Sequence, residues 1–551
     1  MERLSTHNRE GTICELQRNK FDLLIIGGGI TGAGIALDAV SRGLRTALIE
    51  KNDFAWGTSS RSTKLIHGGL RYLKQFEIML VREMGHERAV LHRLAPHLVR
   101  SGKMMLPILE NGAFGKFTTS VGLMLYDFLA GVESEDQRKM LDREETIFME
   151  PLLAREDLEG AAVYAEYRTD DARLTIEVMK TAVNYGAVAM NYLSAVDFIY
   201  NENVVCGVLA KDGFTGEKFE INTKYVVSAA GPWVDELRMK DKSFNEKKLH
   251  LSKGVHIVLA HETFPVRHAI YFNSHDDRMV FAIPRGKVTY VGTTDTDFQD
   301  RPTRVTASQE DVQYLVKAVN SAFNEIQITV SDIISSWAGL RPLIDEEGKD
   351  VTEISRKDEI FISGTGLVSI AGGKLTGYRK MAEKIIDTLL ESDNGTSIDR
   401  ENLKDECFTD AIPLVGGDFA GDKELEVYTV GIARRMNGYR LTREDAQYLV
   451  SNYGRQCDEI IDSMRDIEEQ DPALRLLKAE ALFSIGHELV HTLLDFFVRR
   501  TGRMYFWIES VEQYYLKIAE YFHEILGWNE KRLVNEKKDV EGLLFESRNF
   551  S

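Results

Sequence analysis

Apolar and polar positions follow two different periods along this chain, and the change falls near residue 393. Before it, short apolar runs such as 21–26 and 46–49 alternate with amphipathic stretches, a pattern typical of strands separated by helices. The pattern predicts an α/β part, residues 20–392, and a C-terminal all-α domain, residues 393–551. In the second part we find only helical periodicity, over 421–437, 442–452, 470–500 and 503–527.

Two interleaved units are expected within residues 20–392. The apolar runs 224–230 and 366–371 each end in a Gly-rich turn and indicate strands that return to the sheet begun at residue 21. Residues 250–300 instead alternate apolar and polar positions, which favours a mainly antiparallel sheet with a site on one face. We assign about 20–95, 160–245 and 345–392 to the first unit, and about 96–159 and 246–344 to the second. Helices are expected over 76–95, 171–185, 308–323 and 378–391, a loop over 111–119 and a buried apolar segment over 121–129.

The first strand runs directly into a glycine turn. Gly27, Gly29 and Gly32 give the spacing G-x-G-x-x-G, a helix follows, and the next strand ends at Glu50. Gly27 permits a tight turn, Gly29 lets the backbone approach a pyrophosphate, and the helix N-terminus attracts phosphate. Glu50 can hold both hydroxyls of a ribose. The glycines alone are a weak signal, but the complete βαβ unit predicts a dinucleotide site, with NAD and FAD both open.

A loop rich in hydroxyl groups, glycines and basic residues, 52–72, follows Glu50. It lies just beyond the carboxyl end of the second strand, where doubly wound sheets bind ligands. A polar surface loop is the alternative, but we expect its hydroxyl and backbone N–H groups to complete the pyrophosphate shell.

Charge and cysteine content narrow the possible partners. The net charge is −18, which argues against nucleic acid and disfavours loose binding to anionic membrane. An anionic substrate would therefore need a local cluster of basic residues. Cys14, Cys206, Cys407 and Cys457 are widely scattered, so we expect neither a disulfide framework nor a metal site. Without a secretory signal or a long apolar run, the chain fits a cytoplasmic setting.

One aromatic amphipathic segment, 503–522, has two interpretations. The favoured one is a helix packed on the C-terminal domain. The other is a contact with a membrane surface or a quinone, which its excess of Glu over Lys weakens.

Several motifs together carry a family resemblance. The stretches 27–50, 59–72, 230–233, 292–295, 339–342 and 372–379 are collinear over roughly residues 20–390 and resemble the FAD-dependent, aerobic glycerol-3-phosphate dehydrogenases. The loop after Glu50 and the turn Gly372-Gly-Lys-Leu-Thr are specific, whereas many flavoproteins share the first glycines. The resemblance implies a Rossmann-like FAD-binding domain with an interleaved antiparallel-sheet substrate domain, as in D-amino-acid oxidase.

The resemblance also implies FAD, expected here as a non-covalent cofactor, and oxidation of sn-glycerol 3-phosphate to dihydroxyacetone phosphate. Electrons would pass to a membrane quinone, with a peripheral contact on the inner face of the cell membrane and a homodimer as further expected associations. The implied substrate ligands are Arg71, Tyr72, His256, Arg341, Arg356 and Lys374. We expect the FAD contacts to come from Gly27, Gly28, Gly29, Ile30, Thr31, Gly32, Glu50, Lys51, Thr58, Ser59, Ser60, Thr63, Lys64, Leu65, His67, Gly69, Lys374, Leu375 and Thr376.

The reaction assigns roles to three of these residues. A guanidinium pairs two phosphate oxygens, and Arg341 is the strongest candidate because it ends an apolar strand before Pro342. Lys374, in a Gly-rich turn at a helix start, would stabilise the negative charge that develops at flavin N1–C2=O on reduction. His256 is the candidate general base, although it could only hydrogen-bond the structure or the substrate. His67 remains an alternative base, or a covalent tether of the flavin.

Three other functions stay open. A glycerol-3-phosphate oxidase would share these motifs and pass electrons to O₂. An amine oxidase of the same fold would bind a carboxylate in place of a phosphate. A nucleotide-binding sensor would have no enzymatic activity and no flavin colour.

Overall fold

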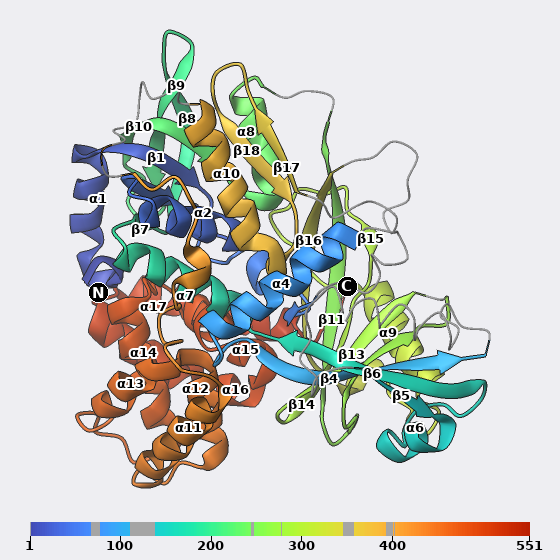
Figure 1. The fold of residues 1–551 in the computed structure, drawn as a ribbon. Coiled ribbons are helices and arrows are strands. Elements are labelled where there is room, and N and C mark those ends of the chain that lie inside the picture. The colour runs from blue at the N-terminus through green and yellow to red at the C-terminus, as the bar shows by residue number, and fades with distance from the viewer. Residues whose placement is uncertain are drawn as a thin grey trace.

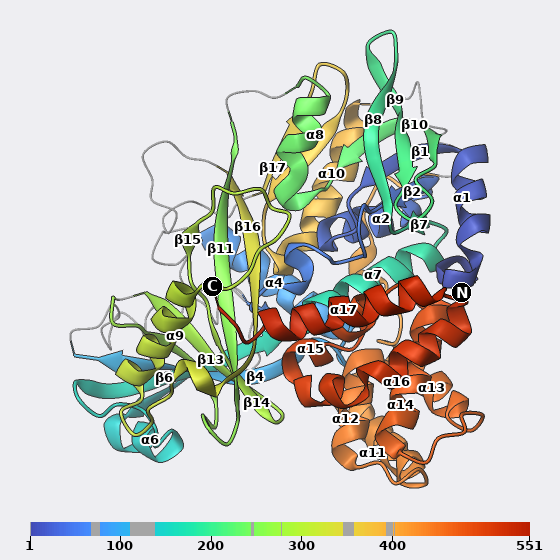
Figure 2. The same ribbon diagram turned by 180° about the vertical axis from the view of Figure 1, so that it is seen from behind.

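The computed structural model describes residues 2–67, 78–110, 138–243, 247–276, 278–344, 358–392, 401 and 403–550. It contains two β-sheets and a group of helices formed by the C-terminal residues, drawn in orange and red in Figure 1. The N-terminus lies beside these helices, whereas the C-terminus lies beside the second sheet (Figures 1 and 2). The predicted loop 111–119 and the predicted apolar segment 121–129 both lie outside the described residues.

The first sheet has the strand order β17-β18-β10-β1-β2-β7, and β8 and β9 extend it as a hairpin from β10. β1, β2, β7, β10 and β18 pair in parallel, so the predicted return of segments 224–230 and 366–371 to this sheet is confirmed. β1 is buried on both faces, as its continuous apolar run requires. The strands are β1 (Lys20–Ile26), β2 (Thr46–Ile49), β7 (Val188–Met190), β8 (Leu193–Asn201), β9 (Val204–Asp212), β10 (Lys218–Ser228), β17 (Asp358–Ile362) and β18 (Val368–Gly372).

Helix α2 follows the glycine turn and lies between α7 and α10 (Figure 1). A Cβ at Gly34 would come within 2.7 Å of the Tyr378 ring, so α2 and α10 approach closely because this position lacks a side chain. The helices of this part are α1 (Arg9–Arg18), α2 (Ile30–Ser41), α4 (Ile78–Leu94), α7 (Asp171–Asn184), α8 (Val234–Lys240) and α10 (Tyr378–Ser392).

The second sheet has the order β15-β11-β14-β13-β12-β4-β6-β3, with β16 added beside β11 and β5 beside β6. All its pairs are antiparallel except β12 with β4, which confirms the mainly antiparallel prediction. Its elements are β3 (Leu65–Ile66), β4 (Arg100–Leu109), β5 (Lys139–Asp142), β6 (Leu158–Arg168), β11 (Leu249–Ala260), β12 (Ala269–Asn273), β13 (Met279–Arg285), β14 (Val288–Gly292), β15 (Thr296–Asp297), β16 (Ile333–Ile344), and helices α6 (Arg143–Met149) and α9 (Gln309–Ala322).

Arg341 does not end its strand, and this part of the prediction is wrong. β16 continues to Ile344, with Arg341 opposite Ser252 and Pro342 opposite Leu251 of β11. Among the described residues β16 pairs with β11 alone, so it is an edge strand. Pro342 is tolerated there because an edge strand can lack one N–H donor to the sheet.

The C-terminal part is helical, and its described residues contain no strand, as predicted. The predicted helix 470–500 is interrupted, however, because Glu488 turns inward to pair with Arg173 and Lys180 of α7. The segment 503–522 packs as favoured, with Val511, Ile518 and Phe522 buried. The helices are α11 (Asp422–Asn437), α12 (Arg443–Tyr453), α13 (Cys457–Ser463), α14 (Pro472–His487), a π-helix (Asp495–Arg500), α15 (Arg503–Phe506), α16 (Ile508–Leu526) and α17 (Glu530–Glu546).

Among the residues that the structure describes, none of the helices is both long and apolar enough to span a bilayer.

Candidate active site

A cavity of about 1080 Å³ lies between the two sheets. Its wall extends from the glycine turn after β1 to the turn after β18, and includes residues of β11 and β16. The structure therefore brings together most of the residues that the sequence predicted for the site. Those lining the cavity are Gly27, Gly29, Ile30, Thr31, Glu50, Lys51, Thr58, Ser59, Thr63, Leu65, His67, His256, Arg341, Lys374, Leu375 and Thr376.

Eight predicted residues are not among those lining the cavity. Gly28, Gly32, Ser60 and Lys64 lie beside it, within the same turn and loop. Gly69, Arg71, Tyr72 and Arg356 fall outside the described residues.

The glycine turn has the geometry that a dinucleotide needs. Gly27 has φ +119°, and a Cβ there would lie 2.5 Å from the carbonyl oxygen of Ala229. Gly29 is the N-cap of α2, so the helix N-terminus opens toward the cavity. An extended cavity with a glycine cradle and a helix dipole at one end fits FAD, whose pyrophosphate needs this close backbone approach.

Two backbone N–H groups fix the carboxylate of Glu50 in the cavity wall. Gly28 N–H donates to one carboxylate oxygen at 2.7 Å and Asn52 N–H to the other at 2.8 Å. Burial raises the pKa of Glu50, and these two donors oppose that rise. The carboxylate is thereby oriented toward the place where a ribose would lie, and two lone-pair directions remain for hydroxyl groups.

The hydroxyl-rich loop uses part of its hydrogen-bonding capacity within the protein. Ser59 Oγ accepts the N–H of Ile30 in the first turn of α2, at 3.0 Å. Thr58 Oγ1 donates to the carbonyl of Leu340 in β16 at 2.7 Å, and Trp337 Nε1 donates to the carbonyl of Ser62. The loop therefore joins the glycine turn of the first sheet to β16 of the second.

Lys64 does not line the cavity, although its partner Asp171 does. It has φ +57°, and its buried ammonium pairs with Asp171 and lies 3.8 Å from Asp170. Burial acts to lower the pKa of Lys64, but these two carboxylates raise it. Its side chain thus acts within a structural ion-pair cluster, which no local sequence pattern reveals.

His256 stands in the cavity wall on β11 and is almost fully buried. Its Nε2 lies 3.0 Å from Thr63 Oγ1, and its ring stacks on Trp337 with centroids 4.7 Å apart. Nδ1 is buried and has no hydrogen-bond partner among the described residues. Burial, and then Arg341 and Lys64, hold the pKa of His256 well below 6.5, so the ring is neutral and able to accept a proton.

Arg341 reaches the same cavity from β16. Nη1 donates to Asp295 at 3.1 Å and Nη2 donates to Thr293 Oγ1 at 2.7 Å. The guanidinium fills the space beside Gly254, where any Cβ would overlap Nη2. These contacts orient a guanidinium next to His256, and its planar set of five donors suits an oxyanion.

Lys374 lies where the chain leaves β18. It precedes the 3-10 helix Leu375–Gly377, which runs directly into α10, and its Nζ is buried. Gly373 has φ +78°, and Thr376 Oγ1 donates to the carbonyl of His67 at 3.2 Å. The turn therefore places a cation and a helix start in the same cavity wall as Glu50, after a strand that β10 and β1 separate from β2.

Sequence reasoning missed several residues of the cavity wall. Among them are Arg61, which lies over Trp56 at 5.1 Å, and Trp233, whose ring lies 4.1 Å from Nζ of the predicted residue Lys51. Arg61 sits inside the loop that the sequence singled out, so its basic character was a usable signal. Asp295, the partner of Arg341, lies in the resembling stretch 292–295 but was not selected.

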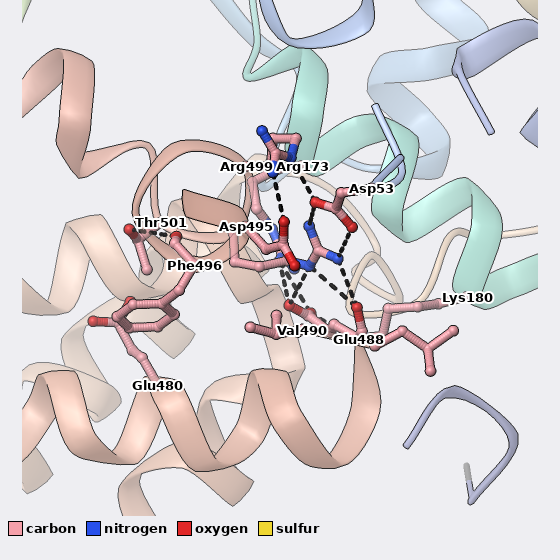
Figure 3. A network of polar contacts seen from close by, with 12 residues as sticks. Asp53, Arg173, Lys180, Glu480, Glu488, Val490, Asp495, Phe496, Arg499 and Thr501 are labelled. Carbon is pink, nitrogen blue, oxygen red and sulfur yellow. Dashed lines mark hydrogen bonds and ion pairs between the residues drawn. The ribbon is translucent and has the colours of Figure 1, made fainter. Parts of the chain in front are cut away.

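Behind the site, a buried ionic network joins the FAD-binding part to the C-terminal helices (Figure 3). Asp53, three residues after Glu50, accepts from Arg499 at 2.5 Å and from two nitrogens of Arg500 at 2.8 Å. Burial acts to raise the pKa of Asp53, but Arg500 and Arg499 lower it to about 2. The turn that follows Glu50 is thus held by residues almost 450 positions later.

Two family patterns match the chain. The one described as FAD dependent oxidoreductase covers residues 22–379, and the one described as the C-terminal domain of alpha-glycerophosphate oxidase covers residues 407–533. Together they span the two sheets and most of the C-terminal helices.

Similar proteins are aligned over nearly their whole length. Aerobic glycerol-3-phosphate dehydrogenase from Bacillus subtilis is 46% identical over 98% of both chains. The enzyme of the same name from Staphylococcus aureus (strain MRSA252) is 46% identical over 99% of this chain and 98% of its own.

Solved structures agree with this assignment. The X-ray structure of the glycerol-3-phosphate dehydrogenase from Bacillus halodurans complexed with FAD covers 99% of both chains with 40% identity and a TM-score of 0.84. A glycine oxidase from Geobacillus kaustophilus, 19% identical with a TM-score of 0.52 over 71% of this chain and 98% of its own, shows the shared fold alone. The predicted fold class and FAD as cofactor are therefore confirmed. This chain belongs to the FAD-dependent, aerobic glycerol-3-phosphate dehydrogenase family.

Proposed function

We propose that this protein oxidises sn-glycerol 3-phosphate to dihydroxyacetone phosphate and that a membrane quinone receives the electrons. The observation that carries the proposal is the meeting of a neutral His256 and of Arg341 in one cavity with the glycine turn and Glu50. The names of relatives that are 46% identical over almost the full length support the substrate.

Arg341 is the proposed ligand of the substrate phosphate. Its guanidinium is already oriented by Asp295 and Thr293, so binding an oxyanion requires little reordering. Arg71, Tyr72 and Arg356 stay predicted substrate ligands.

His256 is the proposed general base. Because it is neutral, it can take the proton from the C2 hydroxyl, and stacking on Trp337 holds the ring in place while it does so. The positive charge that forms on the imidazole would be stabilised by the negative charge of a substrate phosphate bound at Arg341 in the same cavity.

The glycine turn, Glu50 and the turn at Lys374 would hold FAD, whose flavin would supply the acceptor for the hydride from C2. Lys374 and the helix start behind it would hold positive potential at that part of the cavity wall. We propose that FAD is bound non-covalently, with His67 lining the cavity as a contact and not as a tether.

The electron acceptor has a second candidate. The match of residues 407–533 to the C-terminal domain of alpha-glycerophosphate oxidase favours O₂ as the alternative acceptor. Stopped-flow mixing of the reduced protein with a soluble quinone and, separately, with O₂ separates the two. We expect the quinone to reoxidise the reduced flavin faster than O₂ does. If O₂ is faster and peroxide forms, the protein is an oxidase and our proposal for the acceptor is wrong.

The substrate is tested by anaerobic titration of the purified yellow protein. Glycerol 3-phosphate should bleach the flavin absorbance, and dihydroxyacetone phosphate should form in equal amount. Bleaching by glycine or sarcosine, with none by glycerol 3-phosphate, would show an amine oxidase instead. A colourless protein that takes up no FAD would favour the sensor.

A further inference from the structure

A second cavity, of about 1380 Å³, lies between the second sheet and the C-terminal helices. We call it the interdomain cleft. It is lined by residues of β4, β6 and the β13–β14 hairpin on one side, and of α11, α12 and α15 on the other. Ligand sites often form where two such units meet. The same strand β6 lines both cavities, with Glu166 in the first and Arg168 in the second.

The interdomain cleft collects cations in a protein whose net charge is −18. Two of its arginines are neutralised, since Arg285 pairs with Asp170 at 3.1 Å and Arg503 pairs with Glu480 at 2.7 Å. Five other cationic residues, four arginines and one lysine, line the cleft and form no ion pair with the described residues. These are Arg100, Arg168, Lys287, Arg434 and Arg443.

Arg100 is half-buried and Arg168 is exposed, and among the described residues both guanidiniums donate to carbonyl oxygens. Arg168 donates to the carbonyl of Pro284 at 3.2 Å, and Arg100 donates to the carbonyl of His97 at 3.5 Å. Burial lowers the pKa of both guanidiniums, and Arg285 and Arg100 lower that of Arg168 further, whereas Asp422 and Glu426 act to raise that of Arg100. The repulsion of Arg168 by Arg285 and Arg100 would be relieved by an anion bound among them.

His97 adds an unused polar group to the same wall. It is fully buried, it lines the interdomain cleft, and neither ring nitrogen has a hydrogen-bond partner among the described residues. Burial, then Arg173 and Arg100, lower the pKa of His97 to about 3. The neutral ring carries one N–H that can donate to an acceptor without adding charge.

We propose that the interdomain cleft binds a small oxyanion with at least two negative charges, of the phosphate-ester or polycarboxylate class. Arginine forks suit such groups, and a cleft lined by one sign of charge concentrates the opposite ion. Four carboxylates also line the cleft, against seven cations. Asp170 pairs with Arg285, Asp445 accepts the N–H of Thr442, and Glu426 acts on Arg100, while Glu444 lies in the first turn of α12. This site is separate from the proposed substrate site, and it does not depend on the identity of the substrate.

Isothermal titration of the FAD-loaded protein at low salt tests the proposal, with inorganic pyrophosphate and citrate as separate probes. Wild type should bind one or both, and the double variant Arg100→Gln/Arg168→Gln should bind at least about tenfold more weakly. The control Arg465→Gln changes the charge of an arginine that is 76% exposed and should bind like wild type. Pyrophosphate would indicate phosphate chemistry, and citrate alone would indicate carboxylates.

Two further measurements distinguish anion binding in the interdomain cleft from substrate binding in the active site. The double variant should keep the KM for glycerol 3-phosphate, and Arg341→Ala should keep the anion affinity. If the double variant loses its flavin absorbance, Lys287→Gln/Arg443→Gln at the exposed rim replaces it, with the same expected loss.

Three results would overturn the proposal. One is equal affinity in the double variant and in Arg465→Gln, which would mean an adventitious ion only. Another is loss of binding in Arg341→Ala. The third is no binding of either probe by wild type, including the case in which phosphatidylglycerol vesicles bind and the free anions do not.

Discussion

Two glycines shape the reactive end of the cavity as directly as the charged residues do. A Cβ at Gly254 would overlap Arg341 Nη2, and one at Gly292 would overlap the imidazole of His256. The guanidinium can move at its flexible end, whereas the imidazole is held between Gly292 and Trp337. Substitution at either position should therefore disturb one reactive group without touching Glu50 or the glycine turn.

Arg341→Ala should raise KM for glycerol 3-phosphate by about 10- to 150-fold, since a hydrogen bond to a charged group is worth about 1.5–3 kcal/mol. FAD should stay bound, because Arg341 lies away from the glycine turn. Gly254→Ala should raise KM less, by displacing Nη2. Steady-state kinetics with flavin absorbance measure both effects. An unchanged KM in Arg341→Ala would remove Arg341 from the phosphate site.

His256→Gln should slow flavin reduction by about 10²–10⁴-fold while substrate still binds, as expected for loss of a general base. Because the pKa of His256 lies well below 6.5, the wild-type rate at saturating substrate should stay level from about pH 8 down to pH 6.5. Rapid-mixing measurements across this range test both statements. A rate that falls with an apparent pKa near 6.5 would indicate another base, with His67 the next candidate.

At the level of elements, the break between α14 and α15 connects the C-terminal helices to the FAD-binding part. In a continuous helix over 470–500, Glu488 and Arg500 would lie on one straight helix, about three turns apart. The interruption at Glu488 instead lets the Glu488 carboxylate meet Arg173, and lets Arg500 reach both Asp53 and the carbonyl of Glu488. The apolar period of the sequence continues through this break because the flanking residues remain buried.

Asp53→Asn should destabilise the protein by about 3–5 kcal/mol, because it leaves the buried guanidiniums of Arg499 and Arg500 without their shared carboxylate. FAD should also dissociate faster, since Asp53 anchors the turn after Glu50. Thermal unfolding followed by flavin fluorescence measures both effects. Asp462→Asn, at a site that is 62% exposed, is the matched control. Equal melting temperatures for the two variants would contradict a supporting role for the network.

At the scale of the whole molecule, buried histidines tie stability to pH. The folded state holds His97 neutral with a pKa of about 3, whereas an unfolded chain protonates it near 6.5. Below that value the unfolded state binds more protons, so stability falls as the pH falls from 6.5. Glu536 has the opposite effect, because burial raises its pKa to about 7. The folded protein therefore binds this proton at a higher pH than the unfolded chain does, and the contribution of Glu536 to stability grows as the pH falls below about 7.

His97→Gln isolates one of these effects. Relative to wild type, its melting temperature should rise as the pH falls from about 7 to 5. The reason is that the variant lacks the neutral histidine, which lowers the free energy of unfolding of wild type by about 1.4 kcal/mol for each pH unit below 6.5. His86→Gln, at a site that is 67% exposed, should show no such trend. Thermal unfolding of the FAD-loaded proteins at several pH values gives the comparison. A parallel course of His97→Gln and wild type would show that His97 is protonated in the folded state.

The sequence by itself determined the elements whose evidence is local. The βαβ unit from Lys20 to Glu50, the sheet strands and the helical end all follow from spacing within windows of about 30 residues, because periodicity and turn glycines act over short distances. The division into domains at about residues 95, 160, 245, 345 and 393, and the membrane, quinone and homodimer associations, stay predictions.

Only the tertiary structure decided which polar side chains face the cavity. Lys64 and Lys374 both lie in specific motifs, yet Lys64 is paired with Asp171 and Lys374 lines the cavity. The pairing of Asp53 with Arg500 and the cations of the interdomain cleft were equally absent from the sequence pattern. The physical reason is that a charged side chain takes its direction and its protonation from partners on distant segments, and those partners are set only when the sheets and helices pack together.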